Sequence, residues 1–512
     1  MSFNNFDALP HSASKTIKPF NVAIPHQDLD NLTTLLKLSR LPPPTYENTL
    51  PRGGGPRLGL RRDWLSAAKK HWETEFDWRK CEQHINTFPH FKAPISIQLA
   101  LDGDHDHHHD QADPDSDSGM DTSMDMDIHF VALFSQRHDA IPLLLLHGWP
   151  GSFLEFLPIL SHLRRQYTAD TLPYHVIVPS LPGYTFSSSP PMNATFRPDD
   201  AARVFDTLAT STLGFKSYMV QGGDLGGRIA RIIAATYPKC KAVHLNTHPM
   251  PAPDDASVKL KLQSTINDTE QAGLERHNFF LHNGTAYAFE HATRPATIGA
   301  VLSSSPLALL SWIGEKFLDW TDDPHPSLDI ILESVTLYWL TNCAATSLYS
   351  YRAFYGPNAD SHGSPKWHIS NKPLGYSWFP KEINPIPRAW IETTGNLVFY
   401  RQHDKGGHFA ALERPNDLWA DVDDFVQSVK DVPFRLLHAV DAASYRTREL
   451  RFTYPCRPKY LCDMLPYGHI TNLLSRSRVI AHRSTLEDFV YLYTLTTERH
   501  GRFSHGSDEF KQ

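Results

Sequence analysis

The segment Gly222-Gly223-Asp224-Leu225-Gly226-Gly227 has the residue types of a sharp turn that exposes one side chain. It follows an apolar stretch that predicts a strand, and it opens a stretch with helical spacing. Flanking glycines permit such a strand-to-helix turn, and the exposed residue is Asp224. A carboxylate there can attack carbon and form an ester. The alternative is an ordinary glycine-rich turn in which Asp224 caps a helix.

A second segment, His147-Gly148-Trp149-Pro150-Gly151-Ser152, follows the apolar run 141–146. A turn at this place can aim backbone N–H groups at a developing oxyanion, and the expected donors are the amides of Trp149 and Leu225. Alone, the segment would be a plain turn. Its position ahead of the Asp224 turn favours an oxyanion site.

A histidine, His408, lies in the segment Gly406-Gly407-His408-Phe409 after the predicted strand 396–402. It could take a proton from water. Since the chain has 29 histidines, only the position after the last strand singles this one out. Two polar neighbours, Asp404 and Glu413, are too close in sequence to supply a separate orienting group.

The order nucleophile, acid, base requires a carboxylate after the predicted strand 373–380, and Glu382 stands at that strand's end. Taken alone, Glu382 would be interpreted as a solvated surface residue. Its place between Asp224 and His408 indicates the acidic partner of the base instead.

Strands alternating with helices place these residues on a mostly parallel sheet. The predicted strands of this part are 141–147, 174–180, 217–223, 241–247, 373–380 and 396–402, with helices around 198–211 and from Leu225. Residues 250–365 are mainly helical and predict a cap over the carboxyl edge of the sheet. Before the sheet, spacing predicts helices over 31–41 and 61–78 and period-two strands over 95–102 and 127–135.

Charge is unevenly distributed along the chain. The net charge is −7 over 512 residues, and the stretch 102–127 contains ten Asp and no Lys or Arg. Without that insertion the chain would be close to +3, which argues against a basic nucleic-acid face. A metal-binding role for His105, His107, His108 and His109 is possible by residue type, but a solvated low-complexity tip is favoured.

Five scattered cysteines without a CxxC motif argue against a disulfide scaffold or a cysteine-rich zinc site. The first twenty residues have neither a basic start nor an apolar run, so we expect no signal peptide or membrane anchor. No stretch of about 18 apolar residues predicts a membrane span. We therefore expect a cytoplasmic protein.

Several long segments resemble the microsomal-type epoxide hydrolases, and in particular their soluble fungal members. The similarity covers roughly residues 19–430 and includes PFNVAIPHQDLDNLTTLLKLSRLPPPTYE, HGWPGSFLEF, GGDLGG, TRPATIGAVLSSSPLALLSWIGEKF and GGHFAALERP. The resemblance implies an α/β-hydrolase fold with a mostly parallel central sheet, a helical cap, an N-terminal meander, and neither metal nor organic cofactor.

The implied domains are an N-terminal epoxide hydrolase region (1–92), a core in two parts (93–249 and 366–430), and a cap (250–365). The acidic insertion (102–127) and a C-terminal extension (431–512) do not fit the family pattern.

The resemblance also assigns roles to individual residues. Asp224 matches the nucleophile, His408 the water-activating base and Glu382 its acidic partner. Tyr287 and Tyr351 match two cap tyrosines that polarise the epoxide, with Tyr349 a rival for the second. The implied partners are a small epoxide and water, with no nucleic acid; a homodimer is left open. The implied role is detoxification or the catabolism of aromatic hydrocarbons.

Two other functions stay open from the sequence. A haloalkane dehalogenase also uses an Asp nucleophile, but it would need Trp or Asn donors for the halide where this chain offers tyrosines. A non-catalytic ligand-binding relative is disfavoured because every catalytic position is filled. A serine esterase is disfavoured because residue 224 is Asp.

Overall fold

The structure, a computed structural model, describes residues 5–50, 58–99, 123–252, 265–355 and 367–431. By its contacts the chain divides into two units, Met1–Ala442 and Ala443–Gln512, and all described residues belong to the first. Most of the acidic insertion with its histidines, and all of the C-terminal extension after Asp431, lie outside the described residues.

A nine-stranded sheet organises the described residues, in the order β1-β2-β3-β5-β4-β6-β7-β8-β9. The strands β5, β4, β6, β7, β8 and β9 are parallel, while β1, β2 and β3 join that block by antiparallel pairing. The predicted mostly parallel sheet with an N-terminal meander is thus confirmed. The strands are β1 (Lys18–Phe20), β2 (His90–Gln98), β3 (Ser123–Leu133), β4 (Ile141–Leu146), β5 (Tyr174–Pro179), β6 (Tyr218–Gly222), β7 (Cys240–Leu245), β8 (Ile369–Trp378) and β9 (Gly395–Gln402).

Strand β4 shows why its sequence is an uninterrupted apolar run. Its Leu144 and Leu146 pack in one hydrophobic cluster with helices α6 (Pro198–Thr207) and α7 (Asp224–Thr236). Its Leu143 and Leu145 pack in a second cluster with α5 (Leu157–Gln166) and α17 (Pro415–Val429). Successive side chains of a strand point to opposite faces, so both faces of the sheet are covered by helices.

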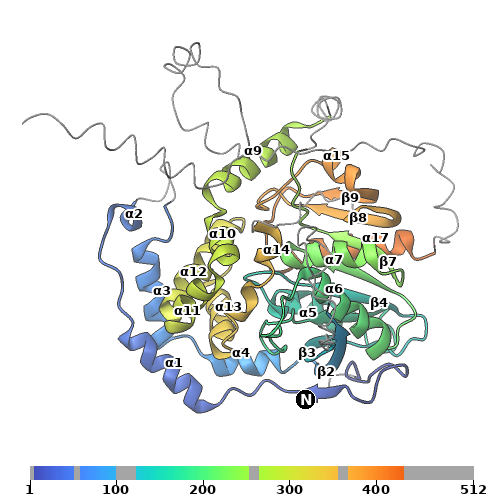
Figure 1. Cartoon of the computed structure of the whole chain (residues 1–512), viewed down its shortest axis with the longest axis horizontal. Helices are drawn as coiled ribbons and strands as arrows, with labels where there is room; N and C mark the ends of the chain where they lie inside the picture. The colour runs from blue at the N-terminus through green and yellow to red at the C-terminus, as the bar shows by residue number, and fades with distance from the viewer. Residues whose placement is uncertain (1–4, 51–57, 100–122, 253–264, 356–366, 432–512) are drawn as a thin grey trace, which may run out of the picture. The chain divides into compact units, whose positions relative to one another are not determined.

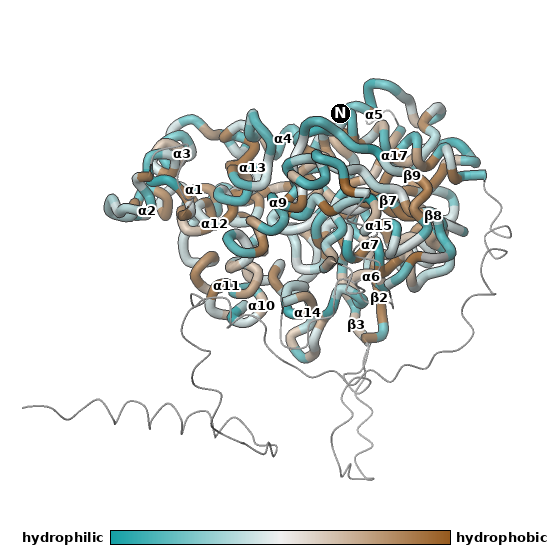
Figure 2. The backbone as a smooth tube through the Cα atoms, turned by 90° about the horizontal axis from the view of Figure 1, so that it is seen from above, coloured by the Kyte–Doolittle hydropathy of each residue, from teal (hydrophilic) through white to brown (hydrophobic). Residues whose placement is uncertain are grey.

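The remaining helices form an N-terminal group and a cap. Figure 1 shows α1 and α3 beside the cap helices α11, α12 and α13, and Figure 2 shows from above the same cap helices set apart from β7, β8 and β9. Their bounds are α1 (His26–Leu38), α2 (Tyr46–Thr49), α3 (Arg62–Thr74), α4 (Trp78–Ile85), α9 (Asp268–Asn283), α10 (Ala286–Thr293), α11 (Pro295–Ser304), α12 (Pro306–Asp319), α13 (Leu328–Leu340) and α14 (Tyr351–Tyr355). Two short helices, α15 (Arg388–Ile391) and α16 (Ala410–Glu413), flank β9.

The N-terminal helices differ from their predicted bounds. The helix predicted over 61–78 is two helices, because the side chain of Asp77 accepts a hydrogen bond from the Arg79 amide and starts α4. The helix predicted over 31–41 begins earlier, at His26, directly after Pro25. Helices α5 and α17 were not predicted, although each buries an apolar face against the sheet.

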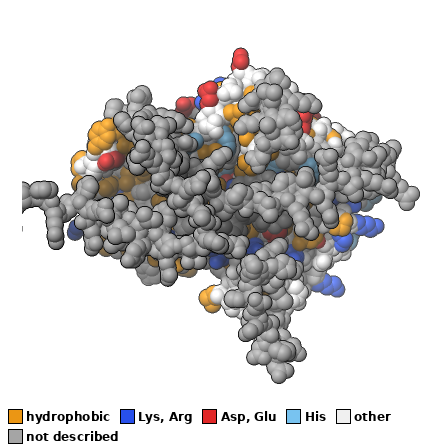
Figure 3. Space-filling view, turned by 45° about the horizontal axis from the view of Figure 1, so that its top comes forward, with side chains coloured by type: hydrophobic (Ala, Val, Ile, Leu, Met, Phe, Trp, Pro, Cys, Tyr) orange, Lys and Arg blue, Asp and Glu red, His pale blue; other side chains and the backbone are white. Residues whose placement is uncertain are grey.

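Within the described ranges, no single helix is long and apolar enough to cross a membrane; only α11 and α12 together reach that length and composition, with a bend of 114° between them. On the face drawn in Figure 3, acidic, basic and hydrophobic side chains of the described residues all reach the surface.

The first turn of α7 packs against the end of β4 so closely that there is no room for a side chain at Gly226. This close packing can be tested by substitution. A Cβ on Gly226 would lie 2.2 Å from the Leu146 carbonyl oxygen, whereas one on Gly227 would lie 3.0 Å from its nearest neighbour. We expect Gly226→Ala to lower the free energy of unfolding by about 1–3 kcal/mol through overpacking. Gly227→Ala should cost clearly less. Urea unfolding of both variants checks this, and equal losses would contradict the close packing.

Candidate active site

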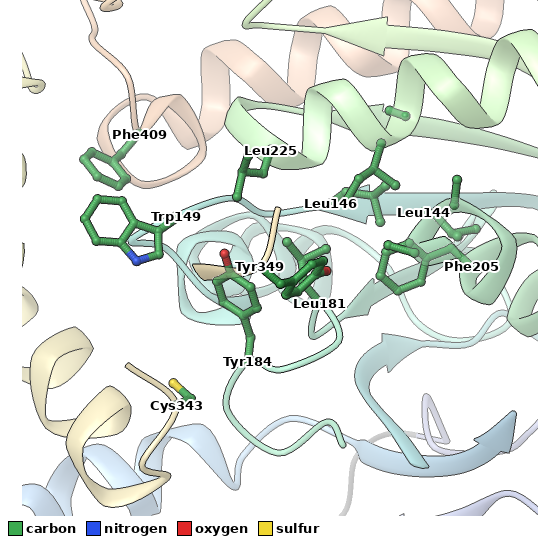
Figure 4. Close-up of a cluster of buried hydrophobic side chains, with 14 of the residues drawn as sticks. Leu144, Leu146, Trp149, Leu181, Tyr184, Phe205, Leu225, Cys343, Tyr349 and Phe409 are labelled. Atoms are coloured by element: carbon green, nitrogen blue, oxygen red, sulfur yellow. The ribbon is translucent and has the colours of Figure 1, made fainter. Parts of the chain in front are cut away.

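Asp224 stands at the turn between β6 and α7, as predicted. Its backbone adopts a φ of 49°, a region that residues with a side chain rarely enter. The Trp149 backbone N–H donates to Asp224 Oδ1 at 2.8 Å. The Leu225 N–H also stabilises the carboxylate. Both predicted oxyanion donors therefore lie beside Asp224, and Figure 4 shows Trp149, Leu225 and Phe409 within one buried cluster.

His408 links Asp224 to Glu382 in a continuous row of contacts. Its Nε2 lies 3.2 Å from Asp224 Oδ2, and its Nδ1 lies 2.7 Å from Glu382 Oε1. Glu382 is 1% exposed, and its Oε2 accepts a 2.6 Å hydrogen bond from the Thr247 hydroxyl. The Ile383 N–H donates to Oε1 at 2.6 Å. The carboxylate is thus fixed from both sides and holds the imidazole toward Asp224.

The loop that carries His408 is held in place by Glu413, which is too close to His408 in sequence to be its predicted acidic partner. Glu413 accepts hydrogen bonds from the backbone N–H groups of Phe409 (3.0 Å) and Asp322 (2.7 Å), which joins the loop to the end of the cap. The His408 N–H itself donates to the Trp320 carbonyl at 2.8 Å. Asp404, the other polar neighbour, is exposed. Glu413 is therefore a support for the loop, while Glu382 is the carboxylate that contacts the imidazole.

The cap brings Tyr287 of α10 and Tyr351 of α14 against the same site. Their ring centroids lie 5.8 Å apart, and they lie 5.2 Å and 5.9 Å from the Trp149 ring. Both are nearly fully buried, and the Tyr351 hydroxyl has no hydrogen-bond partner of ordinary geometry among the described residues. Burial raises the pKa of both phenols well above the usual value, with a further contribution from the charge of Asp224.

Tyr349, the rival for the second tyrosine role, faces a different environment. Its ring packs edge-on against Phe196 at 5.2 Å, and it lines a separate cavity with Thr195, Arg197 and Arg352. Its ring therefore packs away from the pair formed by Tyr287 and Tyr351.

A small cavity opens directly on the row of catalytic candidates. Its volume of about 20 Å³ is room for one water molecule. Its polar lining comes from Asp224, His408, Asn246, His147 and a residue that was not singled out from the sequence, Glu155. Glu155 lies in the segment HGWPGSFLEF, so the sequence places it close to the turn at 147–152. The sequence does not reveal that its side chain points into the cavity.

The charges of this row depend on one another. Burial opposes the charged form of Asp224, but the hydrogen bond and charge of His408 and the two backbone N–H groups outweigh burial and lower the pKa of Asp224. Burial likewise opposes protonation of His408, yet Glu382 and Asp224 hold its pKa well above the usual value. Without substrate, the pair is therefore a carboxylate beside an imidazolium.

No group of three or more His, Cys, Asp or Glu side chains within the described parts of the chain is arranged to hold a metal ion.

The contact between Thr247 and Glu382 can be tested by stability alone. Because a hydrogen bond to a charged group contributes about 1.5–3 kcal/mol, Thr247→Val should lower the free energy of unfolding by that amount. Thr394→Val is the matched control, since the hydroxyl of this buried threonine hydrogen-bonds, among the described residues, to the neutral His248 and to the Ile391 carbonyl and not to a carboxylate. Urea unfolding should show the larger loss for Thr247→Val; a larger loss for Thr394→Val would contradict the role assigned to Thr247.

Comparisons with known proteins identify a family and a fold. Residues 17–156 match the family described as Epoxide hydrolase N terminus, and residues 141–312 match the alpha/beta hydrolase fold. A protein of Dothistroma septosporum is 42% identical over 443 residues, which cover 86% of this chain and 97% of that protein. Epoxide hydrolase 1 of Sus scrofa is 29% identical over 80% of this chain and 89% of its own length.

The solved structure of Aspergillus niger epoxide hydrolase is 46% identical to this chain, with a TM-score of 0.71. The match covers 83% of this chain and 99% of the Aspergillus chain. The predicted α/β-hydrolase fold is thus confirmed, and this protein belongs to the epoxide hydrolase family of α/β hydrolases.

Proposed function

We propose that this enzyme adds water to an epoxide through a covalent ester on Asp224 and releases a vicinal diol. The observation that carries the proposal is that the two oxygens of the Asp224 carboxylate have different neighbours. Oδ1 is engaged by the Trp149 N–H, whereas Oδ2 faces His408. Oδ2 is the oxygen available to attack a ring carbon. Oδ1 then becomes the ester carbonyl oxygen and stays beside the Trp149 amide, where an oxyanion would form.

Ring opening needs hydrogen-bond donors for the epoxide oxygen. Tyr287 and Tyr351 are buried next to Asp224, and their high pKa keeps both phenols protonated at neutral pH. As the C–O bond breaks, the developing alkoxide accepts hydrogen bonds from both phenols and takes a proton from one of them. Two buried tyrosines on cap helices would not by themselves indicate a catalytic role. Their closeness to Asp224, whose charge acts on both phenols, supports this one.

Ester formation also changes the protonation of His408. The charge of Asp224 is one of the interactions that raise the His408 pKa, and the ester removes that charge. The imidazolium can then lose its proton, which balances the proton that a phenol gives to the alkoxide. Neutral His408, oriented by Glu382, accepts a proton from water as the water oxygen attacks the ester carbonyl. The acyl C–O bond then breaks, and the diol oxygen takes that proton from His408. The Asp224 carboxyl, which keeps the other hydrogen of the water, passes it to His408 and so restores the starting state.

The proposed substrate is therefore a small epoxide with water as co-substrate. The two buried phenols favour an epoxide over a haloalkane, because a developing alkoxide requires a proton and a leaving halide does not. Detoxification, aromatic catabolism, a cytoplasmic location and a homodimer stay predictions from the sequence.

His408→Gln should trap the ester. Attack by Asp224 requires no base, whereas hydrolysis of the ester does. Intact-mass measurement after mixing with a styrene-type epoxide should show protein plus one epoxide, stable over many wild-type turnovers. His403→Gln is the matched control, because His403 pairs with Asp421 rather than with Asp224, and it should not accumulate the adduct. Unmodified His408→Gln protein, without an initial burst of product, would contradict the covalent route.

The two cap tyrosines should affect the first step. We expect Tyr287→Phe and Tyr351→Phe each to slow ester formation by roughly 10²-fold, the effect typical of a lost transition-state donor. The double variant should nearly abolish it, whereas Tyr349→Phe should be mild because its ring packs elsewhere. Single-turnover kinetics that separate ester formation from hydrolysis check this. A severe Tyr349→Phe defect with a silent Tyr351→Phe would move the second donor role to Tyr349.

A further inference from the structure

We propose that Glu155 holds the water molecule that attacks the Asp224 ester, by accepting one of its hydrogens while His408 takes the other as a proton. This inference rests on the proposed covalent route and adds a residue to it. The site is the cavity of about 20 Å³ lined among others by Trp149, Glu155, Asp224, Asn246, His408 and Phe409.

The place of the Glu155 carboxyl is determined by the turn that precedes it. Ser152 caps a short 3-10 helix over Phe153–Phe156, with its hydroxyl accepting from the Leu154 N–H at 3.2 Å. This turn folds the Glu155 side chain back over Gly151. A Cβ built on Gly151 would lie only 1.4 Å from Glu155 Oε1. The carboxyl thus occupies space that any residue other than glycine at position 151 would fill.

The Gly151 backbone is itself fixed from the cap. The Tyr338 hydroxyl donates to the Gly151 carbonyl at 2.8 Å, and Tyr338 is 1% exposed. The position of the Glu155 carboxyl group is therefore fixed by residues of both the core and the cap. That rigidity is what a water site needs, because a bound water must keep its orientation toward the ester carbonyl.

The cavity offers few acceptors for the second hydrogen of the water. Once Asp224 is esterified, its carbonyl oxygen faces the Trp149 amide. The Asn246 side-chain oxygen already accepts from Gln221 at 2.8 Å. His147 also lines the cavity, but its Nε2 already accepts from the Leu181 N–H at 3.1 Å and its Nδ1 lies 3.0 Å from the Gly148 carbonyl oxygen. Glu155 is the carboxyl that remains among the polar residues lining the cavity.

The charges around Glu155 change during the reaction. Burial raises the pKa of Glu155 to about 8, the charge of His408 lowers it, and the charge of Asp224 raises it again. Esterification removes the Asp224 charge, but the loss of the His408 proton removes the opposing effect, so these two changes offset each other. In either protonation state the Glu155 carboxyl keeps an oxygen that can accept a hydrogen bond from water. In the hydrolysis step the water oxygen bonds to the ester carbon and one proton moves to His408 Nε2. The other hydrogen stays on the new carboxyl group beside Glu155, which is not consumed.

The test separates the two chemical steps in the full-length protein with a styrene-type epoxide. Glu155→Ala should slow ester hydrolysis by about 10- to 100-fold, the loss expected when the attacking water is no longer held in the reactive orientation. Ester formation should change by less than about threefold, so the adduct should accumulate in intact-mass spectra. Glu155→Gln keeps the shape and one acceptor oxygen and should show a smaller hydrolysis defect.

A second variant displaces the carboxyl without removing it. Gly151→Ala places a methyl group where Oε1 lies, so it should reproduce the hydrolysis defect with Glu155 still present. The matched control is Glu333→Gln. Glu333 on α13 is another carboxyl whose pKa burial raises, to about 7, but it does not line the cavity. This control should leave both steps unchanged.

Three outcomes decide the matter. Adduct accumulation in the Glu155 and Gly151 variants, but not in Glu333→Gln, supports the inference. Unchanged hydrolysis in Glu155→Ala, or equal slowing of both steps, overturns it while leaving the covalent route intact. If neither wild type nor His408→Gln ever forms an adduct, the covalent route fails and the inference fails with it.

Discussion

The positive φ of Asp224 is the constraint on which the site depends. A residue with a side chain adopts this conformation at a cost of about 1–3 kcal/mol, so the surrounding structure must hold it there. The close packing of α7 on β4 at Gly226 fixes the backbone of the turn, and the hydrogen bond from the Trp149 N–H fixes the carboxylate. The strain therefore aims a side chain at a point that no relaxed turn would reach.

The parallel sheet explains how residues from distant parts of the chain reach that point. The carboxyl ends of parallel strands meet at one edge. Trp149 follows β4, Asp224 follows β6, Glu382 follows β8 and His408 follows β9. Three ionisable groups meet there in a buried setting, where an unpaired charge would be costly. Each instead finds a partner, and the outer carboxylate is further satisfied by Thr247.

Much of this arrangement could be predicted from the sequence, because buried strands and glycine-rich turns leave local signals. The turn residues Asp224 and His408 carry such signals. Tyr287 and Tyr351 do not, since an aromatic residue on a helix is usually part of a core, and only the family resemblance selected them. Glu155 was missed for a geometric reason: its direction depends on a 3-10 turn and on the missing side chain of Gly151. The break between α3 and α4 was missed because the apolar spacing continues across it.

The same few groups can serve two opposite steps because their charges change in sequence. In the proposed route, Glu382 and Asp224 together raise the pKa of His408 before reaction. Ester formation would remove the Asp224 contribution, which favours loss of the His408 proton when hydrolysis requires a base. The Trp149 amide needs no such change, since it stabilises first a carboxylate oxygen and then an oxyanion at the same position. In this route the change in charge favours ester formation before hydrolysis, because His408 becomes a better base only after Asp224 has lost its charge.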